Sequence, residues 1–219
     1  MQRILLLETS SRCCSVALAI DGTVAIERSV TDPAGYRHAE LLHPMIDEVL
    51  GSAGVAVREL SAIGAAHGPG SYTGLRIGLA AAKGLALPWN LPVFGVSSLE
   101  LLAEAVREAV PADGLGVWAA MDARRMEVYE AFFGSGLERE SEDSPAIAGE
   151  QWSTRPAAWG GGDGVQKVLA YWPALRDSGV RYASARHALN PVLRQMAAGA
   201  PEDLATWEPR YLKVFGQVL

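Results

Sequence analysis

A glycine-rich segment at residues 68–78, with the sequence GPGSYTGLRIG, constrains the fold of this chain more than any other feature. It follows an apolar run at residues 62–66 that predicts a β-strand, and it leads into a helix at residues 73–87. Glycines at such a junction have two physical uses. They let the backbone approach a phosphate at the helix N-terminus, or they let the helix pack closely on another surface.

The spacing of this segment does not match the common phosphate-binding loops. A Walker loop requires Gly-x-x-x-x-Gly-Lys-Ser/Thr, whereas Leu75 and Arg76 follow Gly74. A dinucleotide fingerprint requires Gly-x-Gly-x-x-Gly, and here the last interval is one residue longer. Ser71 lacks the flanking glycines of a nucleophile elbow. The sequence therefore favours close packing, with phosphate binding as the alternative.

Small residues recur at every fourth position of the helix at residues 73–87. Gly74, Gly78 and Ala82 form one smooth stripe, and the only charged residues are Arg76 and Lys83. A helix that is almost wholly apolar has to be buried, either in its own domain or against a partner. It is too short to cross a bilayer, which requires about 20 apolar residues. Both kinds of burial stay open at this point.

Composition limits the classes of function. The chain has 219 residues, 49% of them hydrophobic, and a formal net charge of -6. It can bury a sizeable core, but it lacks the clustered positive charge of a protein that binds nucleic acid strongly on its own. Cys13 and Cys14 are adjacent, no Cys-x-x-Cys motif occurs, and the N-terminal apolar run is too short for a signal peptide. We therefore expect a reducing, cytoplasmic location without membrane attachment.

The order of predicted elements indicates an α/β fold. Strands are expected at residues 4–7, 15–20, 23–30, 62–66 and 92–96, and helices at 36–50, 73–87 and 97–110. Pro44 is expected to kink the first helix or to begin its second part. Three consecutive strands followed by alternation predict a mixed sheet with helices on its faces, as in one half of ribonuclease-H-like and actin-like proteins.

The second half of the chain predicts a smaller lobe. Strands are expected at residues 116–121, 126–133 and 211–215, helices end near residues 171 and 198, and residues 134–156 are expected to be irregular. We therefore divide the chain into an N-terminal ribonuclease-H-like lobe at residues 1–110 and a reduced C-terminal lobe at residues 111–219.

Few side chains suggest chemistry. His38 and His43 are five positions apart, whereas a helical zinc pair needs a spacing of four, so no metal site is expected. Glu8, Asp122 and Asp163 lie at strand ends or in a glycine turn, where actin-like enzymes orient magnesium and water around ATP. Acidic residues also favour turns in any protein. A catalytic set of carboxylates therefore stays an alternative.

The glycine-rich segment resembles the signature of the bacterial TsaB family, also called YeaZ. The further segments that carry this resemblance are LETS at 7–10, CSVAL at 14–18, KGLA at 83–86, GVSSL at 95–99, MDARRMEVY at 121–129 and, more loosely, GGGDG at 160–164 and EPRYLK at 208–213. The resemblance implies an actin-like ATPase fold with two lobes. It also implies a role in making threonylcarbamoyl-adenosine beside the tRNA anticodon.

In that family the protein is not the transferase. The resemblance implies a partner, TsaD, a paralogue that holds a metal ion and performs the transfer, and a second partner, the ATPase TsaE. ATP and the metal ion are expected on these partners, no cofactor is expected to bind tightly here, and no catalytic residue is assigned. Pairing is expected through the helices at 36–50 and 73–87, with a homodimer when the partners are absent. Transfer RNA is expected to bind only through the complex.

The resemblance also suggests site residues. The expected partner interface comprises His38, Leu41, Leu42, Met45, Gly74, Ile77, Gly78 and Ala80. A vestigial nucleotide site would comprise Glu8, Thr9, Asp122, Gly161 and Asp163. Most members of the family carry Asp at the position of Glu8, and the His-x-x-x-His motif of TsaD is absent here. The alternatives are a stand-alone actin-like ATP-using enzyme, a glycoprotease-like hydrolase, or a homodimeric scaffold unrelated to tRNA.

Overall fold

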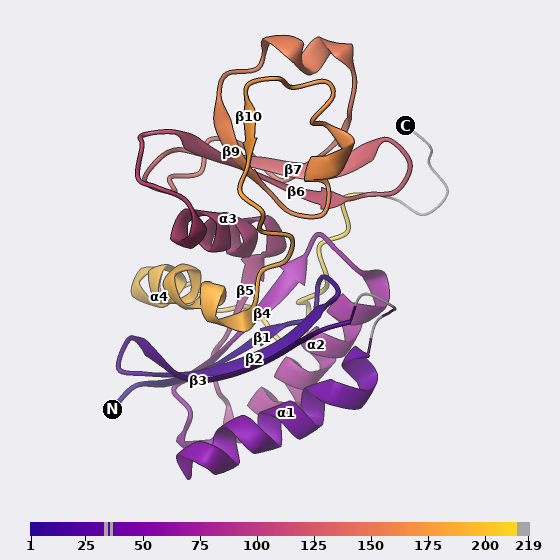
Figure 1. Cartoon of the computed structure of the whole chain (residues 1–219). Coiled ribbons are helices and arrows are strands. Elements are labelled where there is room, and N and C mark those ends of the chain that lie inside the picture. Colours follow the sequence, from indigo (N-terminus) through magenta and orange to yellow (C-terminus); the bar gives the residue numbers. More distant parts are fainter. Residues whose placement is uncertain (33–34, 36, 214–219) are drawn as a thin grey trace.

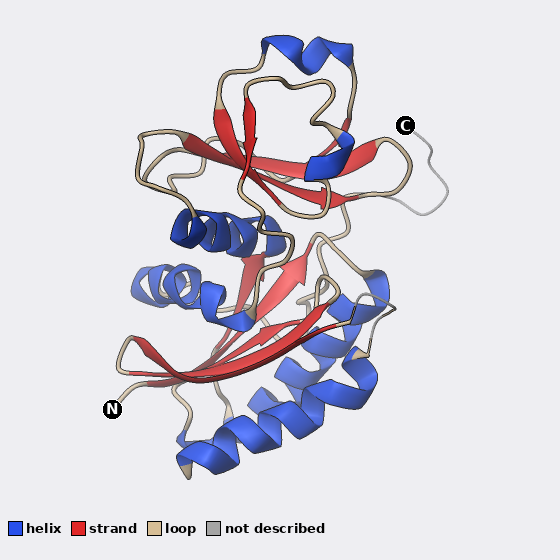
Figure 2. Ribbon diagram, viewed as in Figure 1, coloured by secondary structure: helices blue, strands red, loops and turns tan. Residues whose placement is uncertain are grey.

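Two five-stranded sheets, one above the other, form the two lobes of the protein (Figures 1 and 2). The structure is a computed structural model that describes residues 1–32, 35 and 37–213. Within those ranges, no helix combines the length and the apolar character that crossing a membrane requires.

The first sheet has the strand order β3-β2-β1-β4-β5. Its strands are β1 (Arg3–Glu8), β2 (Cys13–Ile20), β3 (Thr23–Thr31), β4 (Ala62–Gly68) and β5 (Val93–Ser97). The pairs β1–β2 and β2–β3 are antiparallel, whereas β4 pairs parallel with both β1 and β5. The predicted mixed sheet is confirmed.

Helices cover both faces of the first sheet (Figure 1). α1 (His38–Ala53) and α2 (Tyr72–Ala86) lie on one face, and α3 (Ser98–Ala109) and α4 (Leu189–Ala198) lie on the other, between the two sheets. Alternate residues of β1 point to opposite faces, so Leu5 and Leu7 pack in the core with α1 while Ile4 and Leu6 pack with α4. The predicted helices are confirmed, although α1 continues through Pro44. The expected first residue of that helix, Tyr36, lies outside the described residues.

The second sheet has the order β10-β9-β6-β7-β8. Its strands are β6 (Gly116–Asp122), β7 (Glu127–Phe133), β8 (Ser144–Ile147), β9 (Ala158–Gly161) and β10 (Leu175–Asp177). The prediction that residues 134–156 are irregular is wrong for residues 144–147, which form β8. The helix predicted to end near residue 171 is also wrong, because only the short 3-10 turn η4 (Val165–Lys167) forms there. Strands of three or four residues are too short to show a period in the sequence. Residues 211–213 form no strand, and the rest of the strand predicted at 211–215 lies outside the described residues.

Tryptophans fill the outer core of the second lobe. Trp118, Trp152 and Trp172 pack edge to face, with ring centroids 5.3 to 6.3 Å apart. The guanidinium of Arg155 lies over the Trp152 ring at 3.6 Å and binds the carboxylate of Glu130. Three large rings supply apolar contact area that a covering helix would otherwise provide, which explains how the reduced lobe holds a core.

The chain returns to the first lobe near its end. Ala185, Leu189 and Val192 pack against Ile4 and Leu6 of β1. The division at residue 110 therefore places these residues in the wrong lobe. The correction has a simple cause, because the inner face of the first sheet would lack part of its apolar cover without α4.

The glycines of the signature segment bring α2 onto the turn that follows β1. A Cβ atom at Gly74 would overlap the carbonyl oxygen of Thr9, and one at Gly78 would overlap the Thr9 hydroxyl. The Ser71 N–H donates to the carbonyl oxygen of Ser10 at 2.7 Å. An N–H group that could have faced a phosphate is thus satisfied by the chain itself. The glycines serve close packing, and the surface they pack on belongs to the same chain.

We expect Gly78→Ala to destabilise the protein by about 1–3 kcal/mol, because the added methyl group has no room beside Thr9. Gly84→Ala is the matched control in the same helix. A Cβ there meets no atom within 4 Å, so the change should stabilise α2 by up to about 1 kcal/mol. Urea unfolding measures both free energies. Equal stability of the two variants would contradict the packing described for Gly78.

Candidate functional site

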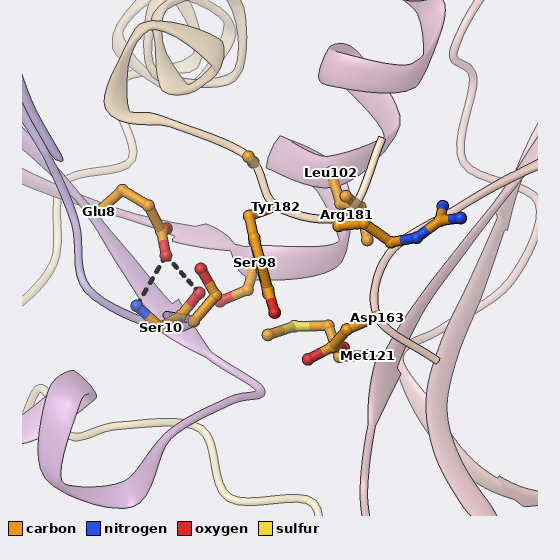
Figure 3. A pocket seen from close by; sticks show the side chains of 10 residues that line it. Glu8, Ser10, Ser98, Leu102, Met121, Asp163, Arg181 and Tyr182 are labelled. Atoms are coloured by element: carbon orange, nitrogen blue, oxygen red, sulfur yellow. Dashed lines mark hydrogen bonds between the residues drawn. The ribbon is translucent and has the colours of Figure 1, made fainter. Parts of the chain in front are cut away.

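A small cavity lies between the two lobes, at the end of β1 (Figure 3). Glu8 and Ser10 from the first lobe, Ser98 from the start of α3, and Asp163 from the second lobe contribute to its wall. Tyr182 lies between Glu8 and Asp163 in this view. The cavity has a volume of about 10 Å³, which is room for about one water molecule.

Glu8 is the buried acid of this cavity. Its side chain is 1% exposed, and its Oε1 accepts hydrogen bonds from the Ser10 N–H at 2.7 Å and the Ser10 hydroxyl at 2.6 Å. Glu8 Oε2 and Ser98 Oγ are buried without a hydrogen-bond partner among the described residues. Burial raises the pKa of Glu8 to about 7, against the opposing effect of the Ser10 hydrogen bonds. Burial likewise raises the pKa of Asp163.

The structure brings together two of the five residues suggested for a vestigial nucleotide site. Glu8 and Asp163 line the same cavity. Asp122 lies outside it, where its Oδ1 accepts a hydrogen bond from the Lys167 ammonium at 2.6 Å. The Asp122 N–H donates to Asp163 Oδ1 at 2.7 Å, so that carboxylate has a structural partner.

The other two suggested residues have packing roles. Thr9 lies under the glycines of α2, and Gly161 in β9 faces Val106 of α3 so closely that a Cβ atom would overlap it. Sequence reasoning missed Ser98 and Tyr182. Ser98 follows the Ser97 cap of α3, which could have placed it beside the end of β1. Tyr182 lies in an irregular segment, and nothing in its local sequence indicates where it folds.

The cavity limits what chemistry this site can perform. Pockets for small molecules and cofactors have volumes of about 300–1,000 Å³, far above this one. Two carboxyl groups with raised pKa values retain protons more readily than free carboxylates. Over the described part of the chain, no three His, Cys, Asp or Glu side chains cluster closely enough to hold a metal ion. The site therefore suits two carboxyl groups that keep their protons in a small space between the lobes better than it suits a nucleotide.

The two histidines of α1 do not converge on a common ligand. His38 is buried, and its Nε2 lies 2.9 Å from the carbonyl oxygen of Ser11. Burial lowers the pKa of His38, although that hydrogen bond opposes the shift. His43 is exposed. His38 thus holds the end of the β1–β2 turn against α1.

Burial corrects the list of expected interface residues. His38, Leu42, Met45, Gly74 and Gly78 are buried within this chain, Leu41 and Ile77 are half-buried, and Ala80 is exposed. The glycine stripe faces Thr9, so it cannot also face a partner. The small residues do allow close packing, but within the chain, whereas Leu41, Ile77 and Ala80 of the expected interface stay accessible, and their contact with a partner stays a prediction.

A second stripe of small and apolar residues lies on the outer side of α2. It comprises Thr73, Ile77, Ala80, Gly84 and Leu87, at intervals of four and three residues that keep one face of a helix. Leu87 is 73% exposed, and Trp89 just beyond it is 50% exposed. We call the five residues from Thr73 to Leu87 in this list the outer α2 stripe; Trp89 lies beside it. Its exposed apolar end is the kind of surface that marks an interaction site.

Comparison with known proteins gives consistent results. A family model described as TsaD, tRNA N6-adenosine threonylcarbamoyltransferase, matches residues 31–158. The tRNA threonylcarbamoyladenosine biosynthesis protein TsaB of Escherichia coli K12 is 33% identical over 225 residues, covering 96% of this chain and 94% of that protein. A tRNA N6-adenosine threonylcarbamoyltransferase of Anaeromyxobacter dehalogenans is 34% identical over 128 residues, covering 51% of this chain and 38% of that protein.

A solved structure described as YeaZ from Pseudomonas aeruginosa also superposes on this chain. The TM-score is 0.83 at 28% identity, and the match covers 97% of this chain and 100% of the other. Together with the two mixed sheets, this likeness confirms the predicted actin-like, ribonuclease-H-like fold. The likeness to TsaB spans nearly the whole chain, whereas the likeness to the transferase spans about half of it.

Replacing Glu8 should change how stability depends on pH. The folded pKa of Glu8, about 7, lies above the ordinary value of 4.5, so the folded state keeps a proton that the unfolded state releases. The stability that Glu8 contributes is therefore full below pH 4.5 and is lost as pH rises through 7. As pH rises from 4.5 to above 7, we therefore expect the Glu8→Gln variant to gain roughly 3 kcal/mol in free energy of unfolding relative to the unsubstituted protein.

Urea unfolding at several pH values checks this expectation. Glu140→Gln, at an exposed glutamate, is the control and should follow the unsubstituted protein at every pH. A Glu8→Gln profile parallel to the unsubstituted one would mean that Glu8 is not held protonated in the cavity.

Proposed function

The chain belongs to the TsaB family and functions in tRNA threonylcarbamoyladenosine biosynthesis, and we propose that it does so as the non-catalytic partner of a TsaD-like transferase. The observation that carries this proposal is the small size of the cavity between the lobes. In a volume of about 10 Å³, Glu8 hydrogen-bonds to its own chain and Asp163 to the Asp122 N–H. A space of this size does not admit a nucleotide.

The reduced second lobe supports the same division of labour. The transferase from Anaeromyxobacter resembles this chain in sequence over only 38% of its own length. Chemistry that needs further elements would then reside in the partner. A stand-alone ATP-using enzyme or a hydrolase is the weaker candidate, since Asp122 and Thr9, two of the residues suggested for such a site, already have structural partners.

We place the partner-binding surface on the outer α2 stripe rather than on the glycine stripe. Ile77, Ala80 and Leu87 offer apolar contacts, and Leu41 of α1 is half-buried near them. Small side chains let a partner helix approach closely, which favours shape complementarity across the contact. The same surface would form a homodimer when the transferase is absent. A TsaE-like ATPase would join the assembled pair, and tRNA would bind through the complex.

Ala80→Arg should abolish assembly with the transferase while the chain stays folded. An exposed alanine accepts the new side chain in the monomer, whereas a buried charge at the centre of an interface can weaken binding by 2 kcal/mol or more, as hot-spot changes do. Ala109→Arg, at the exposed end of α3, is the matched control and should assemble normally. Analytical ultracentrifugation measures assembly, and circular dichroism measures the fold. Normal assembly of the folded Ala80→Arg protein would place the interface elsewhere.

The chain alone should bind ATP weakly or not at all. Nucleotide would have to open the lobes and displace Tyr182 from between Glu8 and Asp163. Isothermal titration calorimetry with ATP and magnesium should therefore give no saturable heat at micromolar concentrations. A submicromolar dissociation constant would instead favour the stand-alone enzyme.

A further inference from the structure

The end of the described chain crosses from the first lobe to the second and shapes the surface beside α2. We call residues 202–213 the C-terminal strap. At its start, the Glu202 N–H donates to the Val93 carbonyl oxygen at 2.8 Å, and Trp207 is buried in the core that contains α2 residues. The strap is therefore part of the folded structure and not a loose extension.

The middle of the strap explains the first glycine of the signature segment. The Arg210 N–H donates to the His67 carbonyl oxygen at 2.7 Å. A Cβ atom at Gly68, whose φ is +120°, would lie 2.6 Å from the Arg210 carbonyl oxygen. Only glycine combines that backbone angle with so close an approach. Two segments that resemble the family, far apart in the sequence, thus form one structural unit.

The far end of the strap is anchored on the second lobe. Arg210 pairs with the buried carboxylate of Asp143 at 3.4 Å. The Lys213 ammonium pairs with the Glu127 carboxylate and donates to the Ala123 carbonyl oxygen at 3.1 Å. These contacts fix Tyr211, which lies between them in sequence, at the boundary of the two lobes.

Aromatic rings and an arginine meet where the strap passes the start of α2. The rings of Tyr72 and Tyr211 stack with centroids 4.9 Å apart at an interplanar angle of 27°. Each tyrosine is 43% exposed. The Arg76 guanidinium lies 5.0 Å from the Tyr72 ring centroid and donates to the Tyr72 hydroxyl at 3.1 Å. The result is a fixed, partly exposed aromatic platform with a positive charge beside it.

Two more arginines lie at the strap's far end, in the β6–β7 turn. Arg124 and Arg125 have φ angles of 71° and 50°, a left-handed backbone that favours glycine or asparagine over arginine. Burial first, and repulsion from Arg125 second, lower the pKa of Lys213, which places Arg125 beside the strap. Backbone strain of this kind persists where surrounding structure holds it, often at functional sites.

The charge of these arginines is not balanced locally. Most lysines and arginines of the chain pair with a carboxylate, and the neighbouring acids Asp122 and Glu127 pair with Lys167 and Lys213. Over residues 1–32, 35 and 37–213, the guanidinium groups of Arg76, Arg124 and Arg125 form no ion pair with a carboxylate, although the Arg124 backbone N–H donates to Asp122 Oδ1 at 2.6 Å. An acidic protein thus presents three exposed, unmatched guanidinium groups along one path beside stacked tyrosines.

We propose that this cationic–aromatic surface, formed by Tyr72, Arg76, Tyr211, Arg124 and Arg125, contacts tRNA within the assembly. The inference rests on the proposed function, because a protein that takes part in tRNA modification works beside a negatively charged tRNA. Arginine matches phosphate oxygens with two parallel hydrogen bonds, and exposed tyrosine rings pack against sugars and unpaired bases. Tyr72 directly precedes Thr73 of the outer α2 stripe, so RNA bound here would lie next to the partner.

The size of the surface explains why it would act only in the complex. Three arginines neutralise few phosphates, and the net charge of -6 repels a polyanion from the rest of the chain. The transferase would supply the remaining contacts, and this surface would add to affinity and orientation.

Arg124→Gln with Arg125→Gln, in the full chain assembled with its TsaD-like partner, tests the proposal. Glutamine keeps much of the side-chain length and removes the charge. Fluorescence anisotropy with a tRNA transcript at several salt concentrations gives the affinity and its dependence on salt. We expect weaker binding and a slope of log affinity against log salt that falls by about 2, or about 1 per lost phosphate contact. Arg58→Gln, at another exposed arginine, is the control and should change neither.

Assembly is measured on the same samples by ultracentrifugation, so that failure of the proposed function can be told from failure of this inference. Intact assembly with unchanged affinity and salt slope would overturn the tRNA surface and leave the partner role intact. Loss of assembly in the double variant would assign the surface to a protein partner and also overturn the proposal. Tyr211→Ala should weaken tRNA binding in the intact assembly with little change in the salt slope, because a ring carries no charge.

Discussion

The packing of α2 onto the turn after β1 is the contact on which the rest of the structure depends. Gly74 and Gly78 let the helix backbone reach Thr9, and the Ser71 N–H is bound by the Ser10 carbonyl oxygen. The Ser71 N–H is therefore not available to a phosphate at the start of α2. The same packing also turns the outer α2 stripe toward solvent. One local constraint thus satisfies a backbone N–H near the start of α2 and leaves the other side of the helix accessible.

In the cavity between the lobes, polar groups likewise form hydrogen bonds within the chain. One carboxylate oxygen of Glu8 accepts hydrogen bonds from the Ser10 N–H and hydroxyl. The pKa of Glu8 rises because the effect of burial outweighs the effect of these hydrogen bonds. Tyr182 lies between Glu8 and Asp163, and Asp163 comes from the second lobe (Figure 3). The strap then ties both lobes together through Arg210 and Lys213. The protein keeps the two-lobed architecture of an actin-like enzyme, and its own side chains occupy the cleft.

Much of this structure could be predicted from the sequence, and the failures have physical causes. Periodic apolar patterns predicted the first sheet and α1 to α3, because long segments carry a clear period. β8 to β10 are too short for that, and the return of α4 to the first sheet depends on contacts distant in sequence. The glycine stripe predicted close packing correctly, but small residues do not reveal which surface they approach. Burial of Leu42 and Met45 within the chain, and exposure of Ala80, became visible only once α1, α2 and the sheet were packed.

The central claim is that this chain positions the transfer reaction without performing chemistry. The most direct measurement is the rate of threonylcarbamoyl transfer to tRNA by the reconstituted assembly in which this chain carries Glu8→Gln and Asp163→Asn together. Both changes keep the local hydrogen-bond acceptors and remove the acids of the cavity. If the chain is a positioning subunit, the assembly transfers at the rate of the unsubstituted one. A loss of about 100-fold or more, the scale expected when a general acid or base is removed, would place chemistry in this chain and contradict the account.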